Sequence, residues 1–229
     1  MTFSLLKANN DTAKGILLNC IRATIGLMCF GVGTYMTIQA GIGAGPWDTL
    51  NLGLSNTFGI LYGTASILVS CVIILIDALI LREPIGLGMI LDAIVVGKTV
   101  DLCNYLDFIP KQDNIWIGIP MMLVGLFIMG FSQYFYMAAA LSCGPRDTLF
   151  VGLNKRFRKI PIGVFSLIIL CIVTFVGWRL GGPVGIGTII FALSAGPLMQ
   201  LAFKIMHFDA ATIQHQNLIQ SFKVIFKKQ

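Results

Sequence analysis

GAGPWDTL occupies residues 43–50, and GPRDTL returns at residues 144–149. Each phrase places an aspartate, Asp48 or Asp147, two residues after a proline, in a chain that is 56% hydrophobic and 11% charged. Soluble domains carry roughly 25% charged residues. Apolar runs of about 20 residues, the length that crosses a bilayer, recur along the 229 residues. The composition therefore predicts an all-α polytopic membrane protein, and the absence of alternating polarity excludes an outer-membrane barrel.

The two phrases belong to a longer internal repeat. A shift of 99 residues superimposes ordered Gly, Pro and Asp positions, which match by chance less often than Leu or Ile. Each half contains a first span (about 16–40 or 115–139), the Gly-Pro segment, a second span (about 60–81 or 160–180) and a third span (about 86–105 or 184–206). Because three spans are an odd number, the second half enters the membrane from the opposite side. We predict six transmembrane helices arranged as two inverted three-helix repeats.

This reading also gives the domain organisation. We expect one integral membrane domain over residues 1–206, with repeat 1 at about 15–106 and repeat 2 at about 114–206, and a cytoplasmic amphipathic tail over 207–229. A short broken or re-entrant helix is expected in each repeat, because proline is favoured at the first position of a helix. Its motif residues are Gly45, Pro46 and Thr49 in the first repeat and Gly144, Pro145 and Thr148 in the second.

The distribution of basic residues predicts the orientation in the membrane. With a cytoplasmic N-terminus, the inside segments hold thirteen of the sixteen Lys and Arg residues, and the outside loops hold only Lys111 and Arg179. The loop at 41–59 has no basic residue, whereas its counterpart at 140–159 has five. This pattern follows the positive-inside rule, so we expect both termini in the cytoplasm.

The repeated aspartates have two interpretations. Asp48 and Asp147 fall in the first turn of a helix, where a carboxylate can accept backbone N–H groups and stabilise the helix start. Alternatively, acids at matching helix breaks of two inverted halves mark a transport site, where the pair would hold a proton or a cation. Trp47 and Arg146 occupy the one position that differs within the phrase and are candidates to distinguish the two sides.

The third span of the first half carries further charge. Asp92, Lys98 and Asp101 have the uncharged repeat partners Phe191, Pro197 and Gln200. Lys98 and Asp101 are three residues apart and can pair on one helix face, while Asp92 lies on another face without a partner. A buried structural pair, a proton relay or substrate contact, and exposure at the membrane edge all fit this pattern.

The sequence favours no catalytic function, since no nucleophile, cofactor or metal motif is present and the six cysteines fit apolar packing. The net charge of +6 is assigned to membrane topology and not to nucleic acid. The expected partners are the lipid bilayer and a small solute or ion, and a homo-oligomer is compatible with the sequence. We expect a secondary transporter that works by alternating access, or alternatively a non-transporting accessory or regulatory protein of another membrane system.

The motifs resemble those of the YczE/YitT family of bacterial integral membrane proteins. The resemblance rests on GIGAGPWDTLNLGLS at 41–55, CGPRDTLFVGL at 143–153, PIGLG at 84–88 and PVGIG at 183–187. It covers about residues 16–206 and is nearer to the YczE type than to the longer YitT type, which has an extra soluble domain. The resemblance implies a bacterial plasma membrane location and no particular substrate or reaction.

Overall fold

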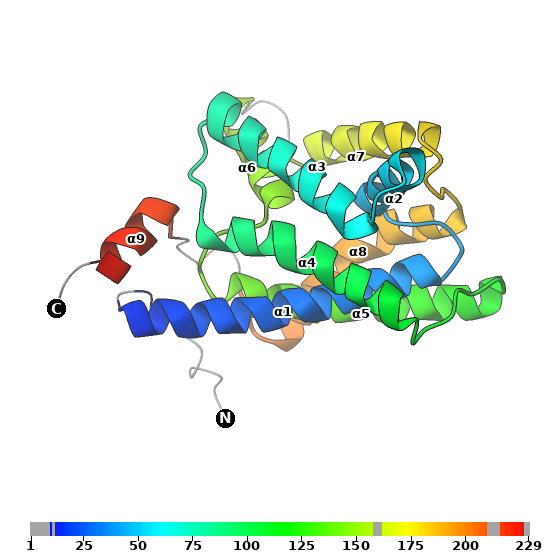
Figure 1. Cartoon of the computed structure of the whole chain (residues 1–229), viewed down its shortest axis with the longest axis horizontal. Helices are drawn as coiled ribbons and strands as arrows, with labels where there is room; N and C mark the ends of the chain where they lie inside the picture. The colour runs from blue at the N-terminus through cyan, green and yellow to red at the C-terminus, as the bar shows by residue number, and fades with distance from the viewer. Residues whose placement is uncertain (1–9, 11, 158–161, 210–215, 227–229) are drawn as a thin grey trace.

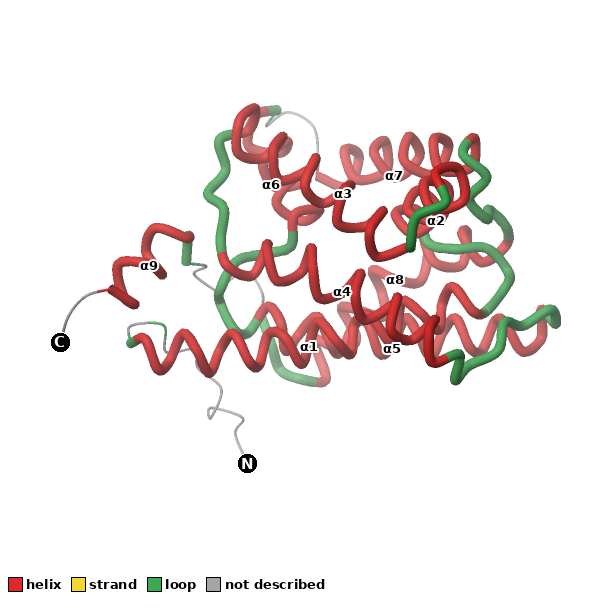
Figure 2. Tube along the Cα trace, in the orientation of Figure 1, coloured by secondary structure: helices red, strands yellow, loops and turns green. Residues whose placement is uncertain are grey.

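The computed structural model describes residues 10, 12–157, 162–209 and 216–226. Every regular element in these residues is helical, which confirms the all-α prediction (Figures 1 and 2). The helices are α1 (Ala13–Gln39), α2 (Pro46–Phe58), α3 (Tyr62–Ile76) with a π-helical continuation (Asp77–Leu81), α4 (Leu87–Leu106), α5 (Ile115–Met137), α6 (Pro145–Arg156), α7 (Ile162–Arg179), α8 (Ile186–Ile205) and α9 (Leu218–Phe226).

The same order of long and short helices occurs in both halves of the chain. A long helix, a short helix beginning at a proline, and two further helices make up α1–α4, and the same sequence of lengths makes up α5–α8. The short helices α2 and α6 have 13 and 12 residues. Their start sites, Pro46 and Pro145, are those predicted from the repeated phrase, because local proline chemistry alone is enough to place a helix start.

Among the described residues, four helices are both long enough and apolar enough to cross a membrane: Ala13–Gln39, Tyr62–Leu81, Ile115–Met137 and Ile186–Ile205. The helix α4 also has 20 residues, but it is not one of these four apolar helices and carries three charged side chains, at positions 92, 98 and 101. The helix α7 has 18 residues and is the shorter apolar helix of the set.

The most extensive helix contact is between α1 and α5, which lie alongside each other along the lower side of the view in Figure 1. Glycines allow their backbones to approach closely: a Cβ atom on Gly33 would lie 2.8 Å from the carbonyl oxygen of Gly125. On either side, α4 packs against α1 and α8 packs against α5. These glycines therefore serve close helix packing.

The connections between helices gather at two ends of the bundle. At one end, called here the Gly45 end, Ala44 N–H donates to the carbonyl of Pro183 at 3.1 Å and Thr57 donates to the carbonyl of Leu180 at 2.9 Å. These contacts hold α2 against the turn after α7.

At the opposite end, called here the Gly144 end, Gly88 N–H donates to the carbonyl of Leu141 at 3.2 Å. Lys155 of α6 forms an ion pair with Glu83 at 2.7 Å. The helix α6 is thereby held against the link between α3 and α4.

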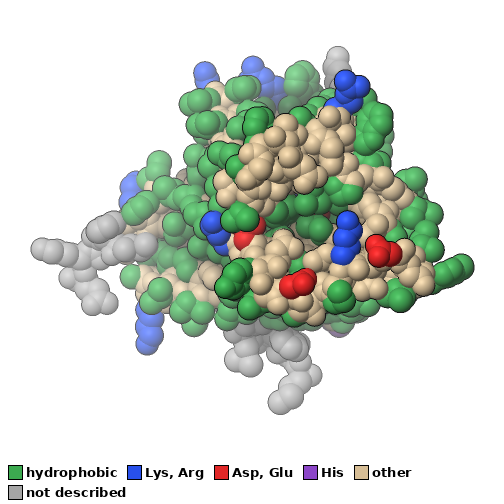
Figure 3. All heavy atoms as spheres, turned by 45° about the vertical axis from the view of Figure 1, so that its right-hand side comes forward, with side chains coloured by type: hydrophobic (Ala, Val, Ile, Leu, Met, Phe, Trp, Pro, Cys, Tyr) green, Lys and Arg blue, Asp and Glu red, His purple; other side chains and the backbone are tan. Residues whose placement is uncertain are grey.

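The segment after α8 reaches the same end. Leu218 N–H at the start of α9 donates to the carbonyl of Ile85 at 2.8 Å, and α9 lies beside the first part of α1 (Figure 1). The expected tail at 207–229 thus includes a short helix with exposed Ile219 and Phe222. On the face shown in Figure 3, hydrophobic side chains cover much of the surface, and the Asp and Glu side chains gather in its lower central part beside Lys or Arg side chains.

Candidate functional site

The two Gly-Pro breaks form matching helix starts. Thr49 N–H donates to Gly45 O and Thr148 N–H donates to Gly144 O, at 2.7 and 3.0 Å. The hydroxyl groups of Thr49 and Thr148 donate to the same two carbonyls, both at 3.0 Å. The threonines, and not the aspartates, therefore bind the backbone at both helix starts.

The carboxylate of Asp48 is buried between α2 and α3. Its side chain is 4% exposed, and Oδ1 accepts a hydrogen bond from the Tyr62 hydroxyl at 2.7 Å. Asn51 donates in turn to that hydroxyl oxygen at 3.4 Å. A short bond to an ionisable carboxylate is of the stronger kind, so Tyr62 orients Asp48 toward the interior.

The carboxylate of Asp147 accepts a hydrogen bond at Oδ2 from Gln133 Nε2 of α5, at 3.3 Å. Asp92 of α4 is its neighbour: a Cβ atom on Gly144 would lie 2.9 Å from Asp92 Oδ2. A side chain at position 144 would therefore clash with the Asp92 carboxylate. Gly144 thus leaves room for this carboxylate, besides preceding the start of α6.

Arg146 and Trp47, which hold the one differing position of the phrase, meet in space. The Arg146 guanidinium carbon lies 5.1 Å from the centre of the Trp47 ring, a cation–π contact. Arg146 forms no ion pair within 4 Å with a carboxylate in the parts of the chain that the structure describes. Its positive charge nevertheless acts on three carboxyl groups, called here the site acids: Asp48, Asp92 and Asp147.

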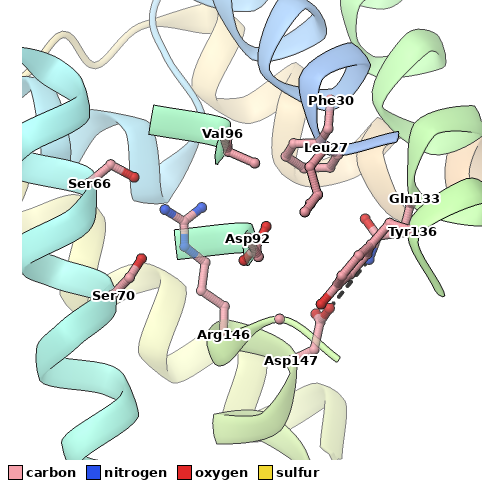
Figure 4. Close-up of a pocket in the computed structure, with 11 residues that line it drawn as sticks. Leu27, Phe30, Ser66, Ser70, Asp92, Val96, Gln133, Tyr136, Arg146 and Asp147 are labelled. Atoms are coloured by element: carbon pink, nitrogen blue, oxygen red, sulfur yellow. Dashed lines mark hydrogen bonds between the residues drawn. The ribbon is translucent and has the colours of Figure 1, made fainter. Parts of the chain in front are cut away.

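These side chains line two adjoining cavities. The larger cavity has a volume of about 270 Å³ and is lined by both repeat aspartates, Asp48 and Asp147, together with Trp47 and Arg146. The smaller cavity has a volume of about 90 Å³ and is lined by Asp92 and by Ser66 and Ser70 of α3. The Arg146 side chain extends between Asp92 and these two serines (Figure 4). Five residues are common to both linings: Phe30, Val96, Gln133, Arg146 and Asp147.

Lys98 and Asp101 are not part of this site. Asp101 Oδ1 accepts the backbone N–H of Gly63 at 2.7 Å, at the start of α3. Lys98 is exposed on α4 and forms no ion pair with Asp101. The buried pair considered for these two residues is therefore wrong, because the close approach of α3 to α4 at Gly63 gives the Asp101 carboxylate a backbone partner instead.

Several site residues were not found from the sequence: Tyr62, Ser66, Ser70, Gln133 and Tyr136. Tyr136 is 4% exposed, and its hydroxyl has no hydrogen-bond partner within the described residues. Gln133 is the one strongly polar side chain in the apolar stretch 115–137, and that isolation was the available signal. Across the described ranges, no group of three or more His, Cys, Asp or Glu side chains could hold a metal ion.

Comparison with known sequences gives the relatives of this chain. The family of unknown function DUF6198 matches residues 17–204. An uncharacterized protein of Haemophilus influenzae is 31% identical over 180 residues, covering 79% of this chain and 81% of its own. The uncharacterized membrane protein YczE of Bacillus subtilis is 28% identical over 178 residues, covering 77% and 81%. YyaS of the same organism is 26% identical over 192 residues, covering 80% and 90%.

No solved structure matches the chain. The relatives confirm the resemblance to YczE, and together with the apolar helices they indicate a multi-pass membrane protein. The chain belongs to the DUF6198 family, which its profile matches over most of the length.

Proposed function

We propose that the protein is a secondary transporter of a small solute or ion, working by alternating access in the bacterial plasma membrane. One observation carries this proposal: the equivalent phrases of the two halves contribute Trp47, Asp48, Arg146 and Asp147 to a single cavity of about 270 Å³. An acid that only stabilises a helix start accepts backbone N–H groups of its own helix, whereas Asp48 and Asp147 accept hydrogen bonds from side chains and line the cavity. Burying charge at membrane depth costs about 2.5–3.5 kcal/mol per residue on insertion scales, and such residues usually have a function.

The proposal includes two inverted three-helix repeats with both termini in the cytoplasm. Its support is the position of the two breaks. The segment before Gly45 bonds to Pro183 and the segment before Gly144 bonds to Gly88, at opposite ends of the bundle. The described basic residues in the last turn of α6, Lys155 and Arg156, belong to the Gly144 end, as a cytoplasmic side requires.

In this mechanism, each short helix closes one side of the cavity. The helix α2 packs on α7 at the Gly45 end, and α6 packs on the end of α3 at the Gly144 end. The contact of Arg146 with Trp47 joins α6 to α2 across the cavity. Opening of the cavity to the outside would move α2, and opening to the cytoplasm would move α6. Either motion would separate the Arg146 guanidinium from the Trp47 ring.

Cysteine accessibility tests alternating access without knowledge of the solute. The six native cysteines are replaced by alanine, and Ser66→Cys is introduced in the lining of the smaller cavity. A membrane-impermeant cationic methanethiosulfonate reagent is applied to right-side-out and to inside-out vesicles. The matched control is Leu68→Cys on the same helix, which is 54% exposed on the outer face of the bundle and should remain an unreactive thiol in lipid.

We expect the thiol at position 66 to react from both sides of the membrane and the thiol at 68 from neither. Reaction from only one side, under every solution condition, would contradict alternating access. That result would favour the alternative of a non-transporting accessory protein, for which a stable co-purifying membrane partner is then expected.

A further inference from the structure

The charges around the two cavities do not balance. Their charged lining residues are one cation, Arg146, and the three site acids. If all were ionised, the site would carry an excess of two negative charges in a largely apolar interior. An uncompensated ion in such surroundings costs several kcal/mol, so the site needs additional positive charge, supplied by protons or by a bound cation. An anionic ligand would increase the imbalance.

Buried polar atoms without partners face the same space. Tyr136, which is 4% exposed, lines the smaller cavity, and Thr34, which is 2% exposed, lines the larger one. Neither hydroxyl group has a hydrogen-bond partner in the described part of the chain. Buried polar side chains almost always have partners in native proteins, so these two hydroxyl groups point to a hydrogen-bonding occupant of the cavities.

The two cavities differ in size and in lining, and the larger cavity has the more apolar lining. The smaller cavity, of about 90 Å³, is well above the roughly 10–15 Å³ of this kind of volume that a single water molecule needs, so it has room for one polar head group. Acceptors suited to the N–H donors of an ammonium group are the carboxylates of Asp92 and Asp147 and the hydroxyl of Tyr136, whereas the guanidinium of Arg146 lies between Asp92 and the α3 serines, Ser66 and Ser70 (Figure 4). The larger cavity adds apolar surface from Leu126, Met129, Phe150, Leu170, Phe191 and Met199.

We propose that the site binds a small organic cation, with an ammonium group beside Asp92 and Asp147 in the smaller cavity and an apolar body in the larger cavity, in exchange for protons. Without the ligand, protons on the site acids offset the negative charge. When a monocation binds, about one proton leaves to solvent, so total charge is conserved. The other titratable side chains that face the site acids are Tyr62, Tyr136 and Cys143.

This inference rests on the proposed function for the fate of the ligand, but binding can be measured by itself. The chain has three tryptophans. Trp116 and Trp178 are 81% and 56% exposed, and replacing both with phenylalanine leaves Trp47 in the cavity lining as the fluorescent probe. The purified full-length variant in detergent is titrated at pH 7.5 with benzylamine, benzyl alcohol, benzoate and phenylalanine.

We expect benzylamine alone to change the Trp47 emission saturably, and to release about one proton per molecule bound in weakly buffered solution. Asp92→Asn should weaken benzylamine binding at least tenfold. The control is Asp107→Asn at the exposed C-cap of the same helix, where Asn also tolerates the left-handed backbone and binding should be unchanged. Size-exclusion profiles and Tm of both variants report whether they fold.

Tighter binding of benzoate or phenylalanine than of benzylamine would overturn the proposal and assign the site to a carboxylate held by Arg146. Equal binding of neutral benzyl alcohol would also overturn it, because charge would then play no part. If the cavity cysteine reacts from both sides but no amine binds, the transport mechanism stands and only the ligand class fails. If the amine binds but the cysteine reacts from one side only, the ligand class stands and transport fails.

Discussion

The contact between Arg146 and Trp47 should hold the cavity closed, and its removal should open the cavity by a measurable amount. The guanidinium lies 5.1 Å from the ring centre, and both side chains line the larger cavity. Cation–π contacts contribute about 0.5–1 kcal/mol when exposed and about 2 kcal/mol when desolvated. A partly enclosed pair is therefore expected to contribute about 1–2 kcal/mol.

If this contact exists only in the closed state, Trp47→Leu raises the open population by the corresponding Boltzmann factor. Since 1.4 kcal/mol is a factor of ten, the expected increase is roughly 5- to 30-fold. The rate of modification of a cysteine introduced at Ser66 reports the open population when opening and closing are faster than the chemical reaction. The rate constant should rise by that factor at low reagent concentration, with a first-order dependence on reagent.

The control is Trp178→Leu, which removes an equally large ring from a position that is 56% exposed and away from the cavity. Its modification rate should match that of the parent. An unchanged or slower rate in Trp47→Leu would refute the reasoning, because it would mean that the stacked pair persists in the open state or does not restrain it.

Three further outcomes follow from other contacts. Asp48→Asn and Asp147→Asn should change the free energy of unfolding by less than about 1 kcal/mol while abolishing amine-linked proton release, because neither carboxylate binds the helix start; a large drop in Tm and abundance would instead support the helix-start role. Gly33→Ala should destabilise by about 1–3 kcal/mol through overpacking against α5, measured as a lower midpoint of unfolding in detergent. Asn10→Ala should cost about 1–3 kcal/mol, because Asn10 is 6% exposed and donates to the carbonyl of Ala140, and an unchanged midpoint would contradict this.

The local features of the fold could be read from the sequence. The first span expected at about 16–40 is α1 at Ala13–Gln39, and the span expected at 86–105 is α4 at Leu87–Leu106. Apolar length and the Gly-Pro dipeptides determine these elements through interactions within a few residues along the chain. Of the two interpretations of the repeated aspartates, the transport interpretation placed Asp48 and Asp147 in one site, and both line the larger cavity.

The partners of these residues could not be read in the same way. Periodicity places Asp101 on a face with Lys98, but it does not reveal that the backbone of Gly63 approaches near enough to take the carboxylate. The repeat places Trp47 and Arg146 at equivalent positions, but it does not reveal that the guanidinium lies over the tryptophan ring.

The sequence by itself determined that this is a helical membrane protein, where its short helices begin, and which acids recur. The tertiary structure alone decided that Tyr62 and Gln133 bind those acids, that Asp92 joins them, and that a single guanidinium is their common neighbour. The physical reason is that helix starts depend on neighbouring residues, whereas the contents of a cavity depend on how closely glycine-lined helices approach across the whole chain.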